Sequence, residues 1–171
     1  MPQPMLHVPL DDPTVAEGLA AVRAQFEVPG PHEPGVVAEA ERAAPEVLAG
    51  LDGPGRRDAR DLELFTVDPP GSMDLDQALH IARRGPGLRV HYAIADVAAF
   101  VAPGGPLDQA CWARGVTYYL PDGRASLHPG ALGEAAARLL PGADRAAVLW
   151  TFDLDAHGVV TANSVERAVV R

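Results

Sequence analysis

The sequence contains no lysine, a single cysteine and no apolar run long enough to cross a membrane. The lone Cys111 excludes an internal disulfide framework and any zinc site built from several cysteines. No signal peptide opens the chain, so we expect no membrane attachment and a cytoplasmic location. All 14 basic residues are arginines, and 23 acidic residues give a net charge of −9. A chain of this charge does not hold nucleic acid by general attraction, so any phosphate contact must be local, through a bound cation or a few placed arginines.

The 171 residues are enough for one ordinary domain with a second small one. A turn over residues 51–57 divides the chain into a proline-rich, partly helical N-terminal segment, residues 1–60, and an alternating domain, residues 61–171. Helices are predicted over residues 14–25, 35–48, 107–113 and 131–140. Strands are predicted over residues 62–67, 78–82, 88–94, 117–120, 147–153 and 159–170.

The predicted fold class is mixed α/β (α+β), with a largely antiparallel sheet flanked by helices. Two hairpins are expected in this sheet, one around residues 84–87 and one around residues 155–158. Four residues of one strand are expected to share a face: Leu88, Val90, Tyr92 and Ile94. Thr14 is predicted to cap the first helix, with Glu17 completing a capping box.

The densest chemical feature is the acidic loop, which we define as residues 68–77, DPPGSMDLDQ. Three carboxylates lie within it, and prolines and a glycine set its path, so Asp68 can fold back against Asp74 and Asp76. Carboxylates held this close stay ionised together only around a cation. Oxygen ligands without His or Cys favour Mg²⁺, or Mn²⁺, over zinc, and such sites perform phosphoryl transfer. In an arbitrary loop, however, the same aspartates would cap turns and face solvent.

Residues 65–79 resemble the signature of the ribonuclease II/ribonuclease R family. The RNB catalytic domain of that family has a strand ending in Asp, a turn of proline or small residues, and then Asp-hydrophobic-Asp-Asp-Ala. Further blocks follow in the family's order and spacing: VHYAIADV at 90–97, LD, RG and YYLPD within 107–122, LHP at 127–129 and AVVR at 168–171. Together these blocks make residues 61–171 similar to the N-terminal portion of an RNB-like catalytic domain.

This resemblance implies a processive 3′→5′ exoribonuclease that hydrolyses single-stranded RNA with Mg²⁺ and releases nucleoside 5′-monophosphates. Asp68, Asp74 and Asp76 match the family's first three acidic residues, and the match makes them metal ligands. Asp76 corresponds to the residue most strictly needed for cleavage. Gln77 stands where the best-known members have a fourth aspartate. Its amide offers a carbonyl oxygen without a charge, so it would orient a water or complete the metal shell.

Two parts of the family pattern are not found in the chain. Residues 1–60 do not resemble the OB domains that usually precede the catalytic domain. The later catalytic segments, which supply a base-stacking aromatic, an arginine near the scissile phosphate and much of the RNA channel, are also absent. We therefore expect a fragment of a longer protein that does not degrade RNA alone. Two other functions stay open: a catalytically silent RNA-binding or regulatory module, and a metal hydrolase of small phosphate esters.

Several residues outside the acidic loop have both a structural and a functional interpretation. Asp96 follows an apolar strand and can either approach the acidic loop or hydrogen-bond a turn. Tyr118 and Tyr119 can stack a base or pack on the sheet. Arg114 and Arg124 can meet a phosphate or form ion pairs.

Overall fold

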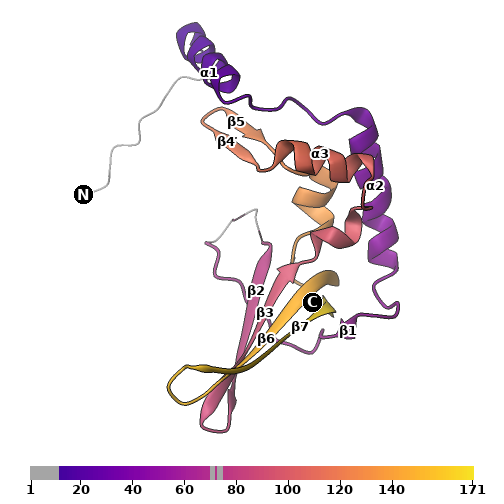
Figure 1. Ribbon diagram of the computed structural model, residues 1–171, viewed down its shortest axis with the longest axis vertical. Coiled ribbons are helices and arrows are strands. Elements are labelled where there is room, and N and C mark those ends of the chain that lie inside the picture. Colours follow the sequence, from indigo (N-terminus) through magenta and orange to yellow (C-terminus); the bar gives the residue numbers. More distant parts are fainter. Residues whose placement is uncertain (1–11, 70–71, 73–74) are drawn as a thin grey trace, which may run out of the picture.

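The computed structural model describes residues 12–69, 72 and 75–171, and a five-stranded sheet is the central element among them (Figure 1). Its strands are β1 (Arg57–Asp58), β2 (Gln77–Arg84), β3 (Gly87–Ala95), β6 (Arg145–Leu154) and β7 (Val160–Val170). The spatial order is β1-β7-β6-β3-β2, and all neighbours are antiparallel except β1 and β7. The predicted mixed α/β fold with a largely antiparallel sheet is thus confirmed.

Helices and a small hairpin form the other half of the molecule, above the sheet in Figure 1. The elements are α1 (Pro13–Gln25), α2 (Pro34–Ala49), the 3-10 turn η1 (Val97–Phe100), α3 (Pro106–Arg114), the π turn η2 (Leu132–Ala136), and the paired strands β4 (Tyr118–Leu120) and β5 (Gly123–Ala125). The side chains of Ala40, Leu107 and Leu132 are fully buried where α2 packs on α3 and η2. No helix in the described part of the chain is long and apolar enough to cross a membrane.

Two hairpins build most of the sheet, as predicted. The turn between β2 and β3 contains Gly85, whose φ of +57° lies in the left-handed region that glycine adopts without strain. The turn between β6 and β7 is held by Asp155, whose Oδ1 accepts the backbone N–H groups of His157 and Val159 at 2.8 and 3.0 Å. These local turn signals favour both hairpins.

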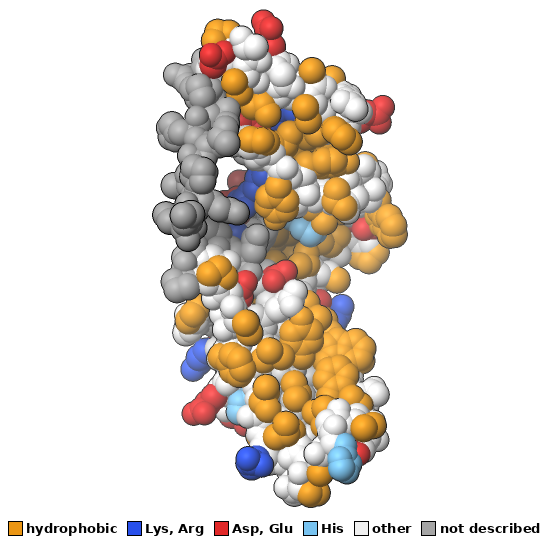
Figure 2. Space-filling model, turned by 90° about the vertical axis from the view of Figure 1, so that its left-hand side faces the viewer, with side chains coloured by type: hydrophobic (Ala, Val, Ile, Leu, Met, Phe, Trp, Pro, Cys, Tyr) orange, Lys and Arg blue, Asp and Glu red, His pale blue; other side chains and the backbone are white. Residues whose placement is uncertain are grey.

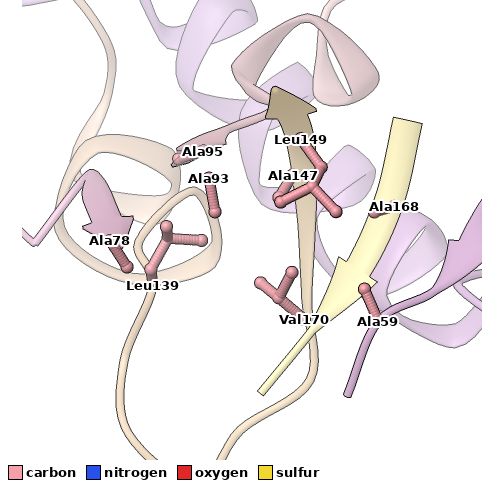
Figure 3. Close-up of a cluster of buried hydrophobic side chains, with 9 residues drawn as sticks. All are labelled: Ala59, Ala78, Ala93, Ala95, Leu139, Ala147, Leu149, Ala168 and Val170. Atoms are coloured by element: carbon pink, nitrogen blue, oxygen red, sulfur yellow. The ribbon is translucent and has the colours of Figure 1, made fainter. Parts of the chain in front are cut away.

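The covered face of the sheet is lined mainly by alanine (Figure 3). Its buried residues are Ala78, Ala93, Ala95, Ala147, Leu149, Ala168 and Val170. The chain from Ala59 through Leu64 and the side chain of Leu139 pack against them. Small side chains let these irregular segments approach the sheet closely, and this packing positions the acidic loop described below.

The opposite face carries the larger apolar side chains. As predicted, one face of β3 carries the side chains of Leu88, Val90, Tyr92 and Ile94. Their partners in β6 are also spaced two residues apart and lie on the same face: Leu154, Phe152, Trp150 and Val148. Trp150 stacks on Phe152 with ring centroids 5.9 Å apart. Figure 2 shows hydrophobic side chains gathered over the lower part of the molecule, where Figure 1 places the sheet. Among the described residues, this face is only partly covered.

Gly87 is the position in the sheet where a side chain is least tolerated. A Cβ built there would lie 1.9 Å from the carbonyl oxygen of Leu154 on the neighbouring strand. We expect Gly87→Ala to lower the free energy of unfolding by about 1–3 kcal/mol, because β3 and β6 must move apart. Gly18→Ala is the matched control, since a Cβ added at that position in α1 meets nothing within 4 Å, and it should add about 0.5–1 kcal/mol. Urea unfolding followed by circular dichroism checks both, and equal stabilities of the two variants would contradict the clash.

Two of the predicted local structures are wrong. The first helix is capped by Asp12, whose carboxylate accepts the N–H of Thr14, because Pro13 occupies the first helical position. Residues 62–67 do not form a strand; only Phe65 bridges to Leu79. The N–H of Leu62 bonds to Ala59 and that of Leu64 bonds to Leu62, so the segment turns locally while its leucines reach the core.

The helix predicted over residues 131–140 is shorter than expected, because its helical structure, the π turn η2, ends at Ala136. After this turn, the N–H of Leu139 bonds to the carbonyl oxygen of Leu75 at 2.7 Å instead of continuing a helical ladder. Three further short elements have no counterpart among the sequence predictions: β1, β5 and η1.

Candidate active site

The described part of the acidic loop is held by backbone hydrogen bonds at its second half. The carbonyl oxygen of Asp76 accepts the N–H of Ala95 at 2.9 Å, at the end of β3. The carbonyl oxygen of Leu75 accepts the N–H of Leu139. At the other end, Phe65 and Leu79 exchange two hydrogen bonds of 2.8 Å, which bring the start of the loop back to β2. The loop therefore lies where β2, the end of β3 and the segment after η2 meet.

Asp68 and Asp76 line one pocket of about 360 Å³. Its other walls are formed by apolar residues, including Phe65, Val67 and Leu79. Both aspartates are exposed, so their carboxylates are accessible to an ion from solvent. Asp74 lies outside the described residues. Among the residues that are described, no three His, Cys, Asp or Glu side chains form a group able to hold a metal. The convergence of all three aspartates therefore stays a prediction, while Asp68 and Asp76 do share a pocket.

Gln77 also lines this pocket, and its amide is already engaged. The hydroxyl group of Tyr92, on the neighbouring strand β3, donates a hydrogen bond to Gln77 Oε1. Tyr92 lines the same pocket. The phenol thus orients the carbonyl oxygen, which keeps a second lone pair for a metal ion or a water, while the amide nitrogen is a donor that cannot ligate a metal ion.

Asp76 also borders a second pocket, of about 260 Å³. Its wall contains hydroxyl groups from Thr117 and Ser126 and the aromatic ring of Tyr119. Tyr119 is 69% exposed, so its ring is not packed on the sheet. Arginines and Glu134 also line the pocket, so it contains charges of both signs.

Two arginines contribute to the second pocket in different ways. Arg124 forms an ion pair with Glu134, which also lines the pocket, and this confirms the ion-pair interpretation of Arg124. Arg138 is only 5% exposed, and its Nε donates to the carbonyl oxygen of Gly133 at 2.8 Å. A buried guanidinium is costly unless anions or carbonyl groups surround it, so Arg138 marks a region that favours negative charge.

Comparison with known proteins identifies the family. A family model described as "RNB domain" matches residues 56–171. The chain belongs to the RNB family. Among curated relatives, this RNB chain is 32% identical over 165 residues to "Ribonuclease R" of Thermotoga maritima, covering 95% of the chain and 23% of that protein. It is also 38% identical over 117 residues to "Inactive exonuclease DIS3L2" of Arabidopsis thaliana, covering 68% of the chain and 11% of that protein.

A solved structure agrees with this assignment. The apo form of Mycoplasma genitalium RNase R superposes with a TM-score of 0.81 at 26% sequence identity, covering 94% of the RNB chain and 24% of that protein. The match therefore includes helices from the N-terminal segment as well as the sheet. The RNB chain spans about a quarter or less of the length of the relatives that it matches.

For Asp96, the sequence allowed either an approach to the acidic loop or a hydrogen bond to a turn. In the RNB chain, Asp96 forms a buried ion pair. Its carboxylate is 1% exposed and lies 3.0 Å from Nη2 of Arg56 and 3.5 Å from Nε of Arg167. The N–H of Asp96 bonds to Ala146, and its carbonyl oxygen accepts the N–H of Ala99 in η1. Asp96 lines neither of the two pockets that contain Asp76. It therefore joins the end of β3 to η1 and to the segment before β1.

Sequence reasoning missed Arg138 as a functional candidate in the RNB chain. It lies in an alanine-rich stretch that predicts a helix, and no local pattern marks it as buried. Arg114, by contrast, has a structural role, because its guanidinium donates to the carbonyl oxygens of Ser126 and Gly30. Tyr118, in β4, is half-buried and lines neither Asp76 pocket, whereas its neighbour Tyr119 does.

Burial makes the RNB chain sensitive to acid through histidine. Burial lowers the pKa of His128, in the second pocket, below its ordinary 6.5, and the positive charge of a protonated His32 lowers it further. The pKa values of His32 and His91 are also lowered, mainly by burial. The unfolded chain therefore binds protons at a higher pH than the folded one, so stability is lost as the pH falls through about 6.5. We expect urea unfolding to show lower stability at pH 5.5 than at pH 7.5.

A substitution tests the contribution of His128. His128→Gln should reduce the difference in stability between the two pH values, because the group that resists protonation in the folded state is gone. His157→Gln, at the exposed turn between β6 and β7, is the matched control. A pH dependence of stability identical in wild type and His128→Gln would contradict the assignment.

Proposed function

We propose that this RNB chain carries the metal-binding part of a 3′→5′ exoribonuclease that hydrolyses single-stranded RNA to nucleoside 5′-monophosphates with Mg²⁺. The observation that carries the proposal is the position of Asp76 between two pockets. One pocket contains a second carboxylate, from Asp68, and the other contains the buried Arg138 and an ion pair between Arg124 and Glu134. A metal ion and a phosphate need these two environments side by side.

The donor set of the first pocket fits Mg²⁺. This ion binds through one or two carboxylates and keeps waters and substrate phosphate as its other ligands. Asp68 and Asp76 supply two carboxylates at an accessible pocket, without any His or Cys ligand that would favour zinc. Asp74, next to Asp76 in the family motif, is proposed as a third carboxylate. Mn²⁺, with the same preference for oxygen, is expected to replace Mg²⁺.

The remaining pocket residues fit a nucleotide. A Mg²⁺ ion bound at the carboxylates would neutralise phosphate charge and lower the pKa of a bound water. The exposed ring of Tyr119 offers a surface on which a base can stack, and Thr117 and Ser126 offer hydroxyl groups to its sugar and phosphate. These contacts are local, as a chain with a net charge of −9 requires. "Mycoplasma genitalium RNase R in complex with ribose methylated single-stranded RNA" is a relative in which such a ligand is bound.

The proposal is tested with the protein as encoded by its gene and with residues 1–171 alone. Single-stranded RNA labelled at its 5′ end is incubated with Mg²⁺, with Mn²⁺, or with EDTA. We expect the encoded protein to shorten the RNA from its 3′ end and release nucleoside 5′-monophosphates only when a metal is present. Residues 1–171 alone should bind RNA weakly without degrading it. Metal-independent cleavage, or turnover of small phosphate esters without any action on RNA, would contradict the proposal.

A catalytically silent RNA-binding module is the second candidate. It is favoured by Gln77 at the fourth acidic position and by a relative at 38% identity whose name contains "Inactive exonuclease". Such a module would bind RNA with an affinity that falls as salt rises, and it would release no mononucleotide. The same assay therefore distinguishes the two functions. The cytoplasmic location stays a prediction in both cases.

A further inference from the structure

A third pocket, of about 420 Å³, lies away from the acidic loop, and we call it the Arg114 pocket. Its wall comes from α1 and the linker before α2, from the end of α3, and from β5 and the segment that follows it. None of the described Asp or Glu side chains lines it, whereas three arginines do: Arg23, Arg114 and Arg124. In a chain with a net charge of −9, a pocket of this composition favours an anion.

Two of these arginines are already compensated, because Arg23 pairs with Asp122 and Arg124 pairs with Glu134. Arg114 differs from both. Its side chain is half-buried, and among the described residues it has no carboxylate partner. A charge that is partly removed from water and has no counterion attracts an anion more strongly than an exposed, paired arginine does.

The guanidinium of Arg114 is held in place by the backbone. Its Nη2 donates to the carbonyl oxygen of Gly30 at 2.6 Å, and its Nη1 donates to that of Ser126 at 3.2 Å. These two bonds use two of its five N–H donors, so three remain for a ligand. Because the group is already ordered, binding a ligand costs it little conformational entropy.

The Arg114 pocket adjoins the smaller of the two pockets that contain Asp76. Three residues line both of them: Arg124, Ser126 and His128. An RNA strand whose last phosphodiester lies at Asp76 carries a further negative charge on each preceding nucleotide. The Arg114 pocket offers such a phosphate a positive charge and N–H donors, whereas the larger Asp76 pocket offers carboxylates and apolar walls.

We propose that the Arg114 pocket binds a phosphate group of the RNA strand, upstream of the nucleotide that is cleaved at Asp76. The inference rests on the proposed function, which places the cleaved bond at Asp76. Arg114 is the residue that binds the phosphate, through charge-assisted hydrogen bonds from its remaining donors. The strand then passes from one pocket to the other along their shared wall.

Gly30 allows the charge of the pocket to be changed without altering Arg114. Gly30 lines the pocket, and a Cβ added there meets nothing within 4 Å. Gly30→Glu and Gly30→Gln add side chains of nearly equal size, and only the first adds a negative charge. Both keep the carbonyl oxygen that Arg114 bonds. We expect Gly30→Glu to bind RNA about fivefold more weakly than Gly30→Gln, because the added carboxylate repels the phosphate.

Affinity is measured by fluorescence anisotropy on residues 1–171, with an eight-nucleotide oligouridylate labelled at its 5′ end. The buffer contains EDTA, so metal-dependent cleavage is excluded. Gly18→Glu against Gly18→Gln is the matched control, because a Cβ at this exposed position of α1 also meets nothing and Gly18 does not line the pocket. The control pair should differ by less than twofold.

Arg114 itself is tested in the same assay. Arg114→Gln should weaken RNA binding by about tenfold, and Arg114→Lys should restore part of it, because the charge returns. Arg42→Gln, in an exposed pair with Glu46 on α2, is the control for the loss of one positive charge. Since Arg114 also joins two backbone segments, the Gly30 variants decide the question if Arg114→Gln fails to fold.

The outcomes separate this inference from the proposed function. Equal RNA affinities of Gly30→Glu and Gly30→Gln would overturn the inference, and release of mononucleotides with Mg²⁺ by the encoded protein would leave the proposed function intact. A fivefold difference without any such release would support the pocket and overturn the proposed function. No RNA binding by residues 1–171 or by the encoded protein would overturn both.

Inorganic phosphate, titrated by calorimetry, distinguishes an RNA strand from a free anion. The octanucleotide should bind wild type at least about a hundredfold more tightly than inorganic phosphate does, because the strand also contacts the Asp76 pocket. A difference between Gly30→Glu and Gly30→Gln that is seen with inorganic phosphate and not with RNA would identify a site for a free anion, and would overturn the inference.

Discussion

Asp76→Asn is expected to slow the release of mononucleotides by about 10³-fold, because a metal ligand supplies several kcal/mol of stabilisation to the transition state. Asparagine keeps the size of the side chain and removes its charge. Asp76 borders both pockets, so no other described residue has the same contacts. RNA affinity should change by no more than about twofold, since base stacking and the arginines are untouched.

A matched variant makes the result specific. Asp61→Asn removes the same charge from an exposed turn that lines neither Asp76 pocket, and it should leave the rate unchanged. Asp68→Asn should have an intermediate effect, because Asp68 borders only the larger pocket. Initial rates are measured on labelled single-stranded RNA with saturating Mg²⁺. Degradation by Asp76→Asn at the wild-type rate would remove the basis of the proposed mechanism.

Loss of the buried carboxylate of Asp96 is expected to have the largest effect on stability. Asp96→Ala should lower the free energy of unfolding by about 3–5 kcal/mol, because Arg56 then remains in a protein interior without its anion. The side chains of Asp96 and Arg56 are 1% and 12% exposed, so water replaces the lost partner poorly. Urea unfolding followed by circular dichroism provides the measurement.

The sheet itself supplies the control for this effect. Arg57 and Glu166 form a pair with the same 3.0 Å separation, but their side chains are 38% and 43% exposed. Glu166→Ala should therefore cost less than about 1 kcal/mol. Equal losses for Asp96→Ala and Glu166→Ala would show that burial does not govern the strength of these pairs. Replacing Arg56 and Asp96 together by leucine should cost less than Asp96→Ala alone, since no buried charge is left unpaired and Arg167, the other arginine near Asp96, is 56% exposed.

The hairpins were predictable from the sequence because their signals are local. Alternating large apolar residues run along β3, and the turns contain Gly85 and Asp155 at positions where those residues are favoured. The sequence also predicted that Leu88 and its neighbours two residues apart share a face. It did not indicate which face is covered, because the alanines that form the core carry a weaker apolar signal than the larger, partly buried side chains of the opposite face.

One missed element, β1, and the burial of Asp96 depend on partners far away in the chain. β1 is only two residues long and exists because Arg57 and Asp58 pair with Ala168 and Val169. Asp96 is buried because Arg56 reaches it from the segment before β1. No local pattern in the sequence reports such contacts.

In the candidate site too, some features were predictable from local sequence and others depend on distant contacts. The family motif located Asp68 and Asp76, and the structure places both at one pocket. The sequence predicts a helix around Arg138 because its neighbours are helix-forming alanines. The chain leaves that helix after η2, where the N–H of Leu139 finds the acidic loop, and this turns Arg138 into the pocket. The hydrogen bond from Tyr92 to Gln77 depends on the pairing of β2 with β3, which brings these two side chains together.

The parallel pairing of β1 with β7 has a consequence for biosynthesis. β1 is the edge strand, β7 is its sole neighbour in the described sheet, and the N–H of Ala59 donates to the carbonyl oxygen of Val169 at 2.9 Å. A nascent chain on the ribosome can fold its early helices and the β2–β3 hairpin, but β1 has nothing to pair with until β7 leaves the exit tunnel. Contacts of such long sequence separation form slowly. Residues 57–64, which help cover the alanine core, are therefore among the last to dock and the most exposed to chaperones and proteases during synthesis.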